Sequence, residues 1–499
     1  MTHLCVPIIE PTAQAALERM RELPRYVGLV EVRLDYIWKA RPNAAGAAVD
    51  ALCLGKDRPI IVTLRPEREG GLCGAPEGQR MELLRRAARA GADFIDVELD
   101  SVAALGEVGG KTRRIVSQHD FSGTPGDLES LHRRALQAGA DVVKIAVRAR
   151  DITDCFPVIE LLKRHAGAVP TIALSMEEEG LITRVLAPKF GAFLSFASMA
   201  EGKGSAPGQV SFREMEELYR FSSINPSTPL YGVVANPVAH SMSPAIHNAA
   251  FAALGLDGVY LPLKVTDPAR FLKGFERYDL RGLSVTIPHK GAMAALMDEL
   301  DDLSASVGAV NTVSYRDGRR LGSNTDVAAA LQTLEGACRR AGLLPMAGRT
   351  VLLLGAGGAG RAMAHALTGL AGRLVIANRT VERAERLCEE LGAECCGLDE
   401  IQGLAPDIVI NTTSVGMHPH VDASPVPASM LRRGMVVFDA VYNPIETLLL
   451  REAREAECVT VAGFEWFVRQ AATQFETWTG HPAPRERMAE VVRERLTAG

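Results

Sequence analysis

The segment DVVKIAV, residues 141–147, places a lysine in the middle of an otherwise apolar run. Its length and its β-branched residues predict a buried strand. An ionised lysine in an apolar interior is costly unless it has a partner or gives up its proton. A neutral lysine amine can attack a ketone to form an imine, which acidifies the neighbouring C–H bond. Lys144 therefore predicts imine chemistry. The alternatives are pairing with a carboxylate or reaching solvent from a strand end.

Polar residues recur on alternate positions of three other strand-like runs. Because alternate residues of a strand share a face, Glu31 and Arg33 of LVEVRLD lie on one side, as do Thr63 and Arg65 of IIVTLR. His119 of VSQHD is placed similarly, and an imidazole can move a proton near neutral pH. If these strands close into one barrel, the polar side chains meet Lys144 inside it. A purely structural layer of salt bridges is the alternative.

Two further residues could complete such a site. Glu69, in the REGG stretch after the third strand-like run, could orient His119. Arg184, in GLITR, could bind a substrate carboxylate through two hydrogen bonds.

Eight strand-like runs must position these residues: HLCVPII, LVEVRLD, PIIVTLR, FIDVELD, RIVSQHD, DVVKIAV, TIALSM and AFLSFA. Helix-like segments separate most of them. Eight strand–helix repeats predict an α/β fold of the (β/α)8 TIM barrel type, which carries its chemistry at the C-terminal ends of the strands. An open doubly wound sheet is the alternative.

The segments EVRLD, TLRPEREGG, SQHDF, VVKIAV, LSMEEEGLITR and SAPGQ resemble type I 3-dehydroquinate dehydratases in order and spacing. The resemblance covers residues 1–222 and implies the loss of water from 3-dehydroquinate to give 3-dehydroshikimate. It implies that Lys144 forms the Schiff base and that His119, assisted by Glu69, is the general acid/base. The substrate contacts that it implies are Glu31, Arg33, Arg65, Met176, Arg184, Ser205 and Gln209.

A second kind of architecture follows the Ser-, Pro- and Asn-rich stretch FSSINPSTPL, residues 221–230. Lys290 lies just past a strand in RGLSVTIPHKGAM, and Asp326 lies in LGSNTDVAAAL. A lysine close to a carboxylate can exchange the proton of a carbinol oxygen while hydride moves. The alternatives are helix caps, at Asp326 and also at Ser243, which Pro244 follows.

The strongest local motif of this half is GRTVLLLGAGGAGRAMAHAL, where an apolar strand leads through GxGxxG into a helix. This arrangement predicts a Rossmann dinucleotide site, which would contain Gly355, Ala356, Gly357, Gly358, Ala359 and Gly360. The next strand ends in Asn378, Arg379 and Thr380 instead of an acidic residue, with Arg383 nearby. Arginines attract a 2′-phosphate, so we expect NADP. The alternative is that the arginines are ordinary surface residues.

Residues 230–499 resemble shikimate dehydrogenases in NPVAHSMSP, SVTIPHK, GAVNT, NTD, GAGGAG, NRT and VRQAATQFETWTG. By resemblance, Lys290 and Asp326 form the catalytic pair, and Gly463 belongs to the cofactor site. The residues expected to hold shikimate are Ser241, Ser243, Thr286, Asn311, Tyr442 and Gln470. The paired serines favour shikimate over quinate.

These observations predict a dehydratase barrel over 1–222, a substrate-binding domain over 230–330 and 464–499, and a Rossmann domain over 331–463. The fused order resembles bifunctional plant enzymes and implies two consecutive steps toward chorismate and aromatic amino acids. The alternatives are a single shikimate or quinate/shikimate dehydrogenase with a non-catalytic barrel, and a dinucleotide-binding sensor.

Composition limits the partners to small molecules. The 499-residue chain has net charge −5 and no Lys/Arg-rich run, so we expect neither nucleic acid nor a membrane surface as a partner. No pattern specifies an oligomeric state. Nine scattered cysteines without a CxxC pair, and no signal or transit peptide, predict a cytoplasmic location. No metal-ligand spacing is visible in either half, so we expect no metal.

Overall fold

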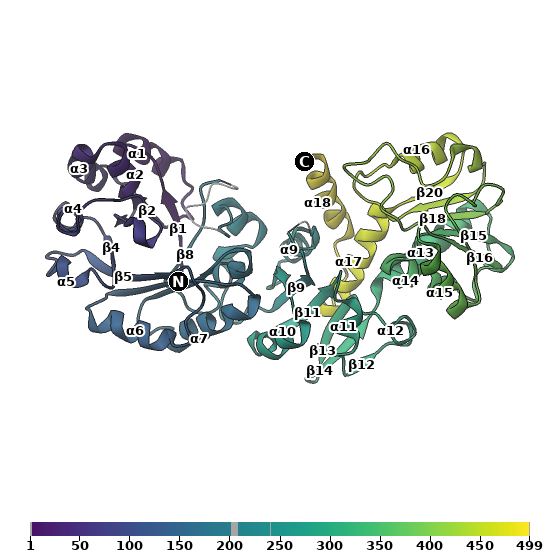
Figure 1. Cartoon of the computed structure of the whole chain (residues 1–499), viewed down its shortest axis with the longest axis horizontal. Helices are drawn as coiled ribbons and strands as arrows, with labels where there is room; N and C mark the ends of the chain where they lie inside the picture. Colours follow the sequence, from purple (N-terminus) through teal and green to yellow (C-terminus); the bar gives the residue numbers. More distant parts are fainter. Residues whose placement is uncertain (1, 201–207, 240, 499) are drawn as a thin grey trace. The chain divides into compact units, whose positions relative to one another are not determined.

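The structure, a computed structural model, describes residues 2–200, 208–239 and 241–498. Its first part contains eight strands in the order β7-β6-β5-β4-β3-β2-β1-β8, all paired in parallel, with helices outside them (Figure 1). The strands are β1 (His3–Ile8), β2 (Leu29–Arg33), β3 (Ile60–Thr63), β4 (Phe94–Glu98), β5 (Arg113–Asp120), β6 (Val142–Arg148), β7 (Thr171–Met176) and β8 (Leu194–Phe196). The helices are α1 (Ala13–Glu22), α2 (Leu34–Ala40), α3 (Ala45–Gly55), α4 (Glu77–Arg89), α5 (Val102–Leu105), α6 (Leu128–Gln137), α7 (Cys155–His165) and α8 (Leu181–Val185). This nearly closed barrel confirms the predicted fold class, and the alternative of an open doubly wound sheet is wrong.

The barrel interior has an apolar floor. One residue near the start of each strand contributes to it: Cys5, Leu29, Ile61, Phe94, Ile115, Val142, Ile172 and Leu194. Two residues further along β2, β4 and β6, the same face presents Glu31, Asp96 and Lys144. Alternation along β6 therefore puts Lys144 inside the barrel, directly above the floor.

Two six-stranded sheets follow. The first has the order β10-β9-β11-β13-β14-β12 and mixed directions, and the second has the order β17-β16-β15-β18-β19-β20 and is parallel throughout. The strands are β9 (Leu230–Ala235), β10 (Val259–Lys264), β11 (Leu280–Val285), β12 (Glu299–Leu300), β13 (Thr312–Arg316), β14 (Arg319–Ser323), β15 (Thr350–Leu354), β16 (Arg373–Ala377), β17 (Glu394–Cys396), β18 (Ile408–Asn411), β19 (Val436–Asp439) and β20 (Val459–Ala462). The helices are α9 (Ser243–Ala253), α10 (Pro268–Phe275), α11 (Lys290–Ala294), α12 (Asp302–Val307), α13 (Thr325–Ala341), α14 (Gly358–Leu367), α15 (Val381–Leu391), α16 (Leu448–Glu455), α17 (Gly463–Thr479) and α18 (Arg485–Ala498). The parallel sheet confirms the predicted Rossmann-type architecture.

Two helix starts correct the sequence interpretation. Helix α13 is capped by Asn324, whose side chain accepts a hydrogen bond from the backbone N–H of Val327 at 3.4 Å. Helix α9 begins at Ser243 itself, with Met242 in the N-cap position. The interpretations of Asp326 and Ser243 as N-caps are therefore wrong, because a neighbouring residue holds the cap position in each case.

The chain divides into two compact units: Met1–Leu230 with Asp257–Leu280, and Tyr231–Leu256 with Arg281–Gly499. The first unit thus combines the barrel with β10 and α10. Within it, the rings of Phe156 and Phe275 stack with their centroids 6.2 Å apart, and the hydroxyl of Tyr278 donates to the Glu160 carboxylate at 2.8 Å. Aromatic packing and this hydrogen bond explain the grouping. The three domain boundaries read from the sequence stay predictions.

In the described part of the chain, no helix combines the length and the apolar composition that a membrane crossing requires.

Candidate active sites

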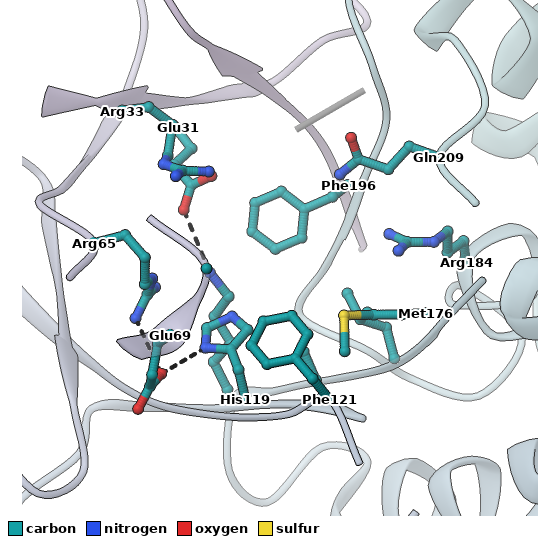
Figure 2. Close-up of a pocket in the computed structure, with 14 residues that line it drawn as sticks. Glu31, Arg33, Arg65, Glu69, His119, Phe121, Met176, Arg184, Phe196 and Gln209 are labelled. Atoms are coloured by element: carbon teal, nitrogen blue, oxygen red, sulfur yellow. Dashed lines mark hydrogen bonds and ion pairs between the residues drawn. The ribbon is translucent and has the colours of Figure 1, made fainter. Parts of the chain in front are cut away.

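A pocket at the C-terminal ends of the barrel strands, called here the barrel pocket, brings together the polar residues expected from the first half (Figure 2). Its lining contains Glu31, Arg33, Arg65, Glu69, His119, Lys144, Met176, Arg184 and Gln209. Ser205, the remaining expected contact, lies outside the described residues. The pocket therefore holds every described residue that the sequence assigned to this half.

Lys144 is buried and paired with two carboxylates. Its Nζ atom donates to Asp96 Oδ2 at 2.8 Å and to Glu31 Oε1 at 3.3 Å, and lies 4.7 Å from the centre of the Phe196 ring. Pairing with a carboxylate, one of the two structural alternatives, is thus present. Lys144 is only 5% exposed, so the amine does not extend into solvent from a strand end. The carboxylates can also accept the proton that the amine must lose before it attacks a ketone.

Arg65 connects this lysine to a second buried acid. Its Nη2 atom donates to Asp96 Oδ1, and its Nη1 atom to Glu98 Oε1, both at 2.7 Å. Burial alone would raise the pKa of Asp96, but the charges of Arg65 and Lys144 lower it. Arg80 binds the other oxygen of Glu98 from α4. The layer above the floor is therefore a continuous network of paired charges.

His119 and Glu69 form a pair at the pocket wall. The Nδ1 atom of His119 lies 2.8 Å from Glu69 Oε2, and Figure 2 shows the carboxylate directed at the ring. Burial, together with the positive charges of Arg65 and Lys144, lowers the pKa of His119 well below its usual value. Burial raises the pKa of Glu69 to about 7. Near neutral pH the imidazole is thus unprotonated and ready to accept a proton, with a carboxylate that can stabilise the resulting charge.

The remaining lining residues suit a polar, anionic ligand. Arg184 from α8 and Gln209 reach the pocket from the side opposite Arg65 in Figure 2. Arg184 is buried, and this burial lowers the pKa of its guanidinium to about 10, still far above neutrality. Asp35 holds the guanidinium of Arg33 through two hydrogen bonds of 2.9 and 2.8 Å. A buried, oriented cation is well placed to bind a carboxylate.

Sequence reasoning missed Asp96, Glu98, Phe121 and Phe196. All but Phe121 follow from the alternation that located Lys144, because FIDVE and LSF also put every second residue inside the barrel. Phe121 follows β5, and its ring stacks on His119 with the centroids 6.3 Å apart.

A second pocket lies wholly within the second unit. Its lining contains all eight residues that the sequence assigned to catalysis and substrate there: Ser241, Ser243, Thr286, Lys290, Asn311, Asp326, Tyr442 and Gln470. Lys290 Nζ and Asp326 Oδ2 are 2.6 Å apart. Lys290 is the first residue of α11, and Asp326 lies in the first turn of α13. Two helix starts therefore deliver a lysine–carboxylate pair to one cavity.

A buried network of amide hydrogen bonds holds the segment that carries Asp326, the carboxylate of this pair. Asn311 Oδ1 accepts the backbone N–H of Thr325 at 2.8 Å, next to Asp326. Gln474, which sequence reasoning missed, donates to the Asn311 carbonyl at 3.0 Å. Trp466 donates its indole N–H to the Asp326 carbonyl at 2.8 Å. Asn311 thus orients α13 in addition to lining the pocket.

Tyr442 lies at the same pocket, with its ring stacked on Phe467 at 4.8 Å between centroids and 7° between planes. Burial raises the pKa of Tyr442, so its hydroxyl stays protonated and can donate to a substrate oxygen near neutral pH.

The glycine-rich turn between β15 and α14 has the geometry of a phosphate cradle. Gly355 has φ +103°, and a Cβ atom on Gly360 would lie 2.0 Å from the Gly355 carbonyl oxygen. Asn378 Oδ1 accepts the backbone N–H of Ala356 at 3.2 Å and so holds the turn. The start of α14 has no side-chain cap in the described residues, which leaves its N–H groups available to a pyrophosphate.

Arg379 and Arg383 are exposed and follow Asn378, whose side chain contacts this turn at Ala356. Both follow β16, Arg379 before α15 and Arg383 in its first turn. Gly463 begins α17, and a Cβ atom there would lie 2.5 Å from the carbonyl oxygen of Ala440. These positions are compatible with the cofactor contacts that the sequence predicted.

Comparison with known proteins agrees with this division. The family model described as type I 3-dehydroquinase matches residues 4–226. Three further models match the second half. Residues 233–313 match the shikimate dehydrogenase substrate binding domain, and residues 338–449 match shikimate / quinate 5-dehydrogenase. Residues 463–493 match the shikimate 5′-dehydrogenase C-terminal domain.

Among curated proteins, the chain is 40% identical over 504 residues to the chloroplastic bifunctional 3-dehydroquinate dehydratase/shikimate dehydrogenase of Arabidopsis thaliana, covering 97% of this chain and 83% of the relative. It is 39% identical to a Bacillus cereus shikimate dehydrogenase (NADP(+)), covering 54% of this chain and 98% of the relative. A crystal structure of a shikimate dehydrogenase in complex with NADP+ matches 55% of this chain and 97% of its own, with 36% identity and a TM-score of 0.50.

The fold and the two pockets define a chain with two enzyme active sites, one in each unit. The chain belongs to the family of bifunctional 3-dehydroquinate dehydratase/shikimate dehydrogenases.

Proposed function

We propose that the barrel pocket dehydrates 3-dehydroquinate through an imine on Lys144. The observation that carries this proposal is one pocket holding the Lys144 amine together with the His119–Glu69 pair. The amine attacks the ketone and water leaves, forming the imine. His119 removes the proton next to the imine carbon and returns it to the departing hydroxyl, which leaves as water. Hydrolysis of the imine then releases 3-dehydroshikimate and restores the amine.

The other lining residues hold the substrate in this scheme. Arg184 binds its carboxylate, with Gln209 and Met176 nearby, and Glu31, Arg33 and Arg65 bind ring hydroxyls. The buried charges of the network are fixed before the substrate arrives, which reduces the reorganisation required during the reaction.

The second pocket reduces 3-dehydroshikimate to shikimate. Lys290 gives the proton that the carbonyl oxygen requires, and Asp326, 2.6 Å away, holds the lysine and exchanges protons with it. Ser241, Ser243 and the Tyr442 hydroxyl line the same cavity and can orient the substrate. Thr286, Asn311 and Gln470 complete its polar wall.

The turn at Gly355–Gly360 fits a dinucleotide, because Gly355 allows the φ of +103° that the tight turn requires and α14 begins without a side-chain cap. NADPH supplies hydride when bound. Arg379 and Arg383 bind its 2′-phosphate, which favours NADP over NAD. The Bacillus cereus relative, named as NADP-dependent, supports this choice. Replacing both arginines with alanine is expected to raise KM for NADPH at least tenfold and to change KM for NADH little.

A coupled assay tests both activities. The purified chain receives 3-dehydroquinate and NADPH alone, and nicotinamide oxidation is followed by absorbance. A parallel sample with borohydride should carry the reduced substrate adduct on Lys144, detected by mass. The Lys144→Ala variant should oxidise NADPH only when 3-dehydroshikimate is supplied.

The same assay distinguishes this proposal from the two alternatives. If wild-type protein needs added 3-dehydroshikimate, the barrel is a non-catalytic scaffold. If 3-dehydroshikimate causes no NADPH oxidation, the second unit is a dinucleotide sensor.

We also place the two reactions in sequence toward chorismate, in a reducing compartment such as the cytoplasm. The first product is the second substrate, and all nine cysteines are free thiols. Cell fractionation followed by detection of the chain tests this location.

A further inference from the structure

Three side chains on the outer helices of the barrel bring possible ligand atoms together. Glu129 and His132 are three residues apart on α6 and so face the same side, and His165 is the last residue of α7. One ligand atom from each lies within 4.8 Å of the other two. Across residues 2–200, 208–239 and 241–498, no other group of three or more His, Cys, Asp or Glu meets this criterion. None of the three lines either pocket.

The hydrogen bonds around His132 fix its proton. The Thr171 hydroxyl donates to the carbonyl of Val169 at 3.0 Å, and His132 Nε2 lies 3.0 Å from the same hydroxyl oxygen. Because the hydroxyl has one hydrogen, Nε2 must be the donor of this second bond. The proton of the neutral ring is therefore on Nε2, and Nδ1 carries a lone pair.

The lone pair of His132 Nδ1 has no hydrogen-bond donor among the described residues, although the side chain is only 1% exposed. Buried acceptors normally have a partner, so this one requires an explanation. Neutral imidazole is a common metal ligand, and ligating histidines usually donate their other ring N–H to a neighbouring group, as His132 does to Thr171.

His165 and Glu129 are spaced as two further ligands would be. His165 Nε2 lies 3.0 Å from Glu129 Oε1, and the His165 ring stacks on His132 with centroids 3.7 Å apart. Metal–ligand bonds of about 2.0–2.1 Å in a tetrahedral site hold ligand atoms roughly 3.3 Å apart. Because the two rings are nearly parallel, at 16°, their nitrogen lone pairs do not converge in this structure. One ion can bind both only after the His165 side chain turns toward His132 Nδ1, which also replaces the His165–Glu129 hydrogen bond.

We propose that Glu129, His132 and His165 bind a divalent first-row transition ion, specifically Zn2+, with water as the fourth ligand. Two imidazoles and a carboxylate suit Zn2+ far better than Mg2+ or Ca2+, which prefer oxygen-only sites. Thr171 starts β7, whereas Met176 at its other end lines the barrel pocket. The ion would thus join α6 to α7 away from the chemistry and stabilise the barrel.

Arg164 provides a matched variant. Its Nη1 atom binds Glu129 Oε2 at 2.9 Å, and its side chain is 63% exposed. The guanidinium competes with a cation for the carboxylate, and its removal should leave the fold intact. Arg164→Gln is therefore expected to bind Zn2+ several-fold more tightly than wild type, whereas His165→Gln should bind it at least tenfold more weakly.

The experiment is a calorimetric titration of the chelator-treated full chain with ZnCl2, in wild type and both variants, with melting curves at each Zn2+ concentration. We expect wild type to bind one equivalent that His165→Gln lacks and to melt at a higher temperature when that equivalent is bound. Both enzyme activities should be the same in all three proteins.

Equal stoichiometry and affinity in wild type and His165→Gln would overturn the proposal. If Arg164→Gln binds Zn2+ no more tightly than wild type does, Glu129 is not a ligand. That result would also overturn the proposal. His132→Gln is a further ligand variant, but the test does not depend on it, because that side chain is buried and its replacement can disturb folding.

Discussion

At the residue scale, the barrel pocket is built on buried charges that are paired, and the central one, Asp96, is shared by two partners. Asp96 binds Lys144 through one oxygen and Arg65 through the other. Taking such charges out of water is costly, so the network is stable only while every member is paired. Its value to catalysis is that the lysine and the arginine are held in fixed positions before substrate binds.

Asp96→Asn tests that dependence. The substitution leaves two buried cations without their shared carboxylate, so we expect a loss of about 3–5 kcal/mol in the free energy of unfolding of the first unit. Dehydratase kcat should fall as well, while dehydrogenase kcat should not change. Urea denaturation and separate assays of the two activities measure these effects.

Asp100→Asn is the matched control, because Asp100 forms an exposed ion pair with Arg68. It should change stability by less than about 1 kcal/mol. If Asp96→Asn and Asp100→Asn have the same free energy of unfolding, the buried charge network does not stabilise the first unit.

The Glu69–His119 pair predicts a pH dependence. Burial raises the pKa of Glu69 to about 7 and lowers that of His119. Above pH 7, the ionised Glu69 accepts from His119 Nδ1–H and stabilises the imidazolium that forms. Below pH 7, Glu69 gains a proton and loses that charge. Dehydratase kcat should therefore fall as pH drops through about 7, up to tenfold per pH unit.

Glu69→Gln should remove this acidic limb and lower kcat at pH 8 at least tenfold. Glu67→Gln, an exposed substitution on the same turn, should keep the wild-type pH profile. An acidic limb that persists unchanged in Glu69→Gln would assign the titration to another group.

Sequence reasoning found Lys144, His119 and Arg65 because strand alternation is a local rule that needs no tertiary information. The same alternation also places Asp96 inside the barrel, but its pairing with Lys144 of β6 and with Arg65 depends on the closure of the barrel, which no local rule specifies. The contact of Arg80 with Glu98 likewise joins α4 to β4, and no spacing in the sequence specifies it.

At the element scale, the reactive side chains lie at the starts of helices and at the ends of strands. Asp326 was the candidate cap for α13, but the structure assigns the cap to Asn324, which leaves the Asp326 carboxylate for Lys290. Capping rules alone could not separate these residues, because Asn and Asp are nearly equivalent N-caps.

Gly360→Ala tests the turn at the start of α14. A methyl group would lie 2.0 Å from the Gly355 carbonyl oxygen, so the turn must open. We expect a loss of about 1–3 kcal/mol in the stability of the second unit and a KM for NADPH raised at least tenfold. Dehydratase kcat should be unchanged.

Gly336→Ala is the control for adding a methyl group to a helix of this unit. Gly336 lies in α13, and the nearest atom to its added Cβ is 3.9 Å away. This variant should keep the wild-type KM and gain up to about 1 kcal/mol in stability. Equal KM values for NADPH in the two variants would contradict the proposed cradle.

At the scale of the whole molecule, one chain carries two pockets that share no lining residue and belong to different compact units. The repeat of eight strands and the GxGxxG turn were enough to predict both architectures, because each is a repeated or local pattern. The inclusion of Asp257–Leu280 in the first unit was not predictable, since it depends on packing between Phe156 and Phe275, which are far apart in the chain.

Because each pocket is complete within its own unit, the two activities should be separable and should complement each other between molecules. Lys144→Ala should lack only the dehydratase activity, and Asp326→Asn should lose most of the dehydrogenase activity. Neither variant alone should convert 3-dehydroquinate to shikimate at more than about 1% of the wild-type rate, since removing a catalytic group costs roughly 10²-fold or more. An equimolar mixture should produce shikimate after a lag, during which free 3-dehydroshikimate accumulates. The time course of both products, followed by chromatography, measures this. If the mixture produced no shikimate while each variant kept its remaining activity, the intermediate would have to pass within one chain, and the two sites would not be independent.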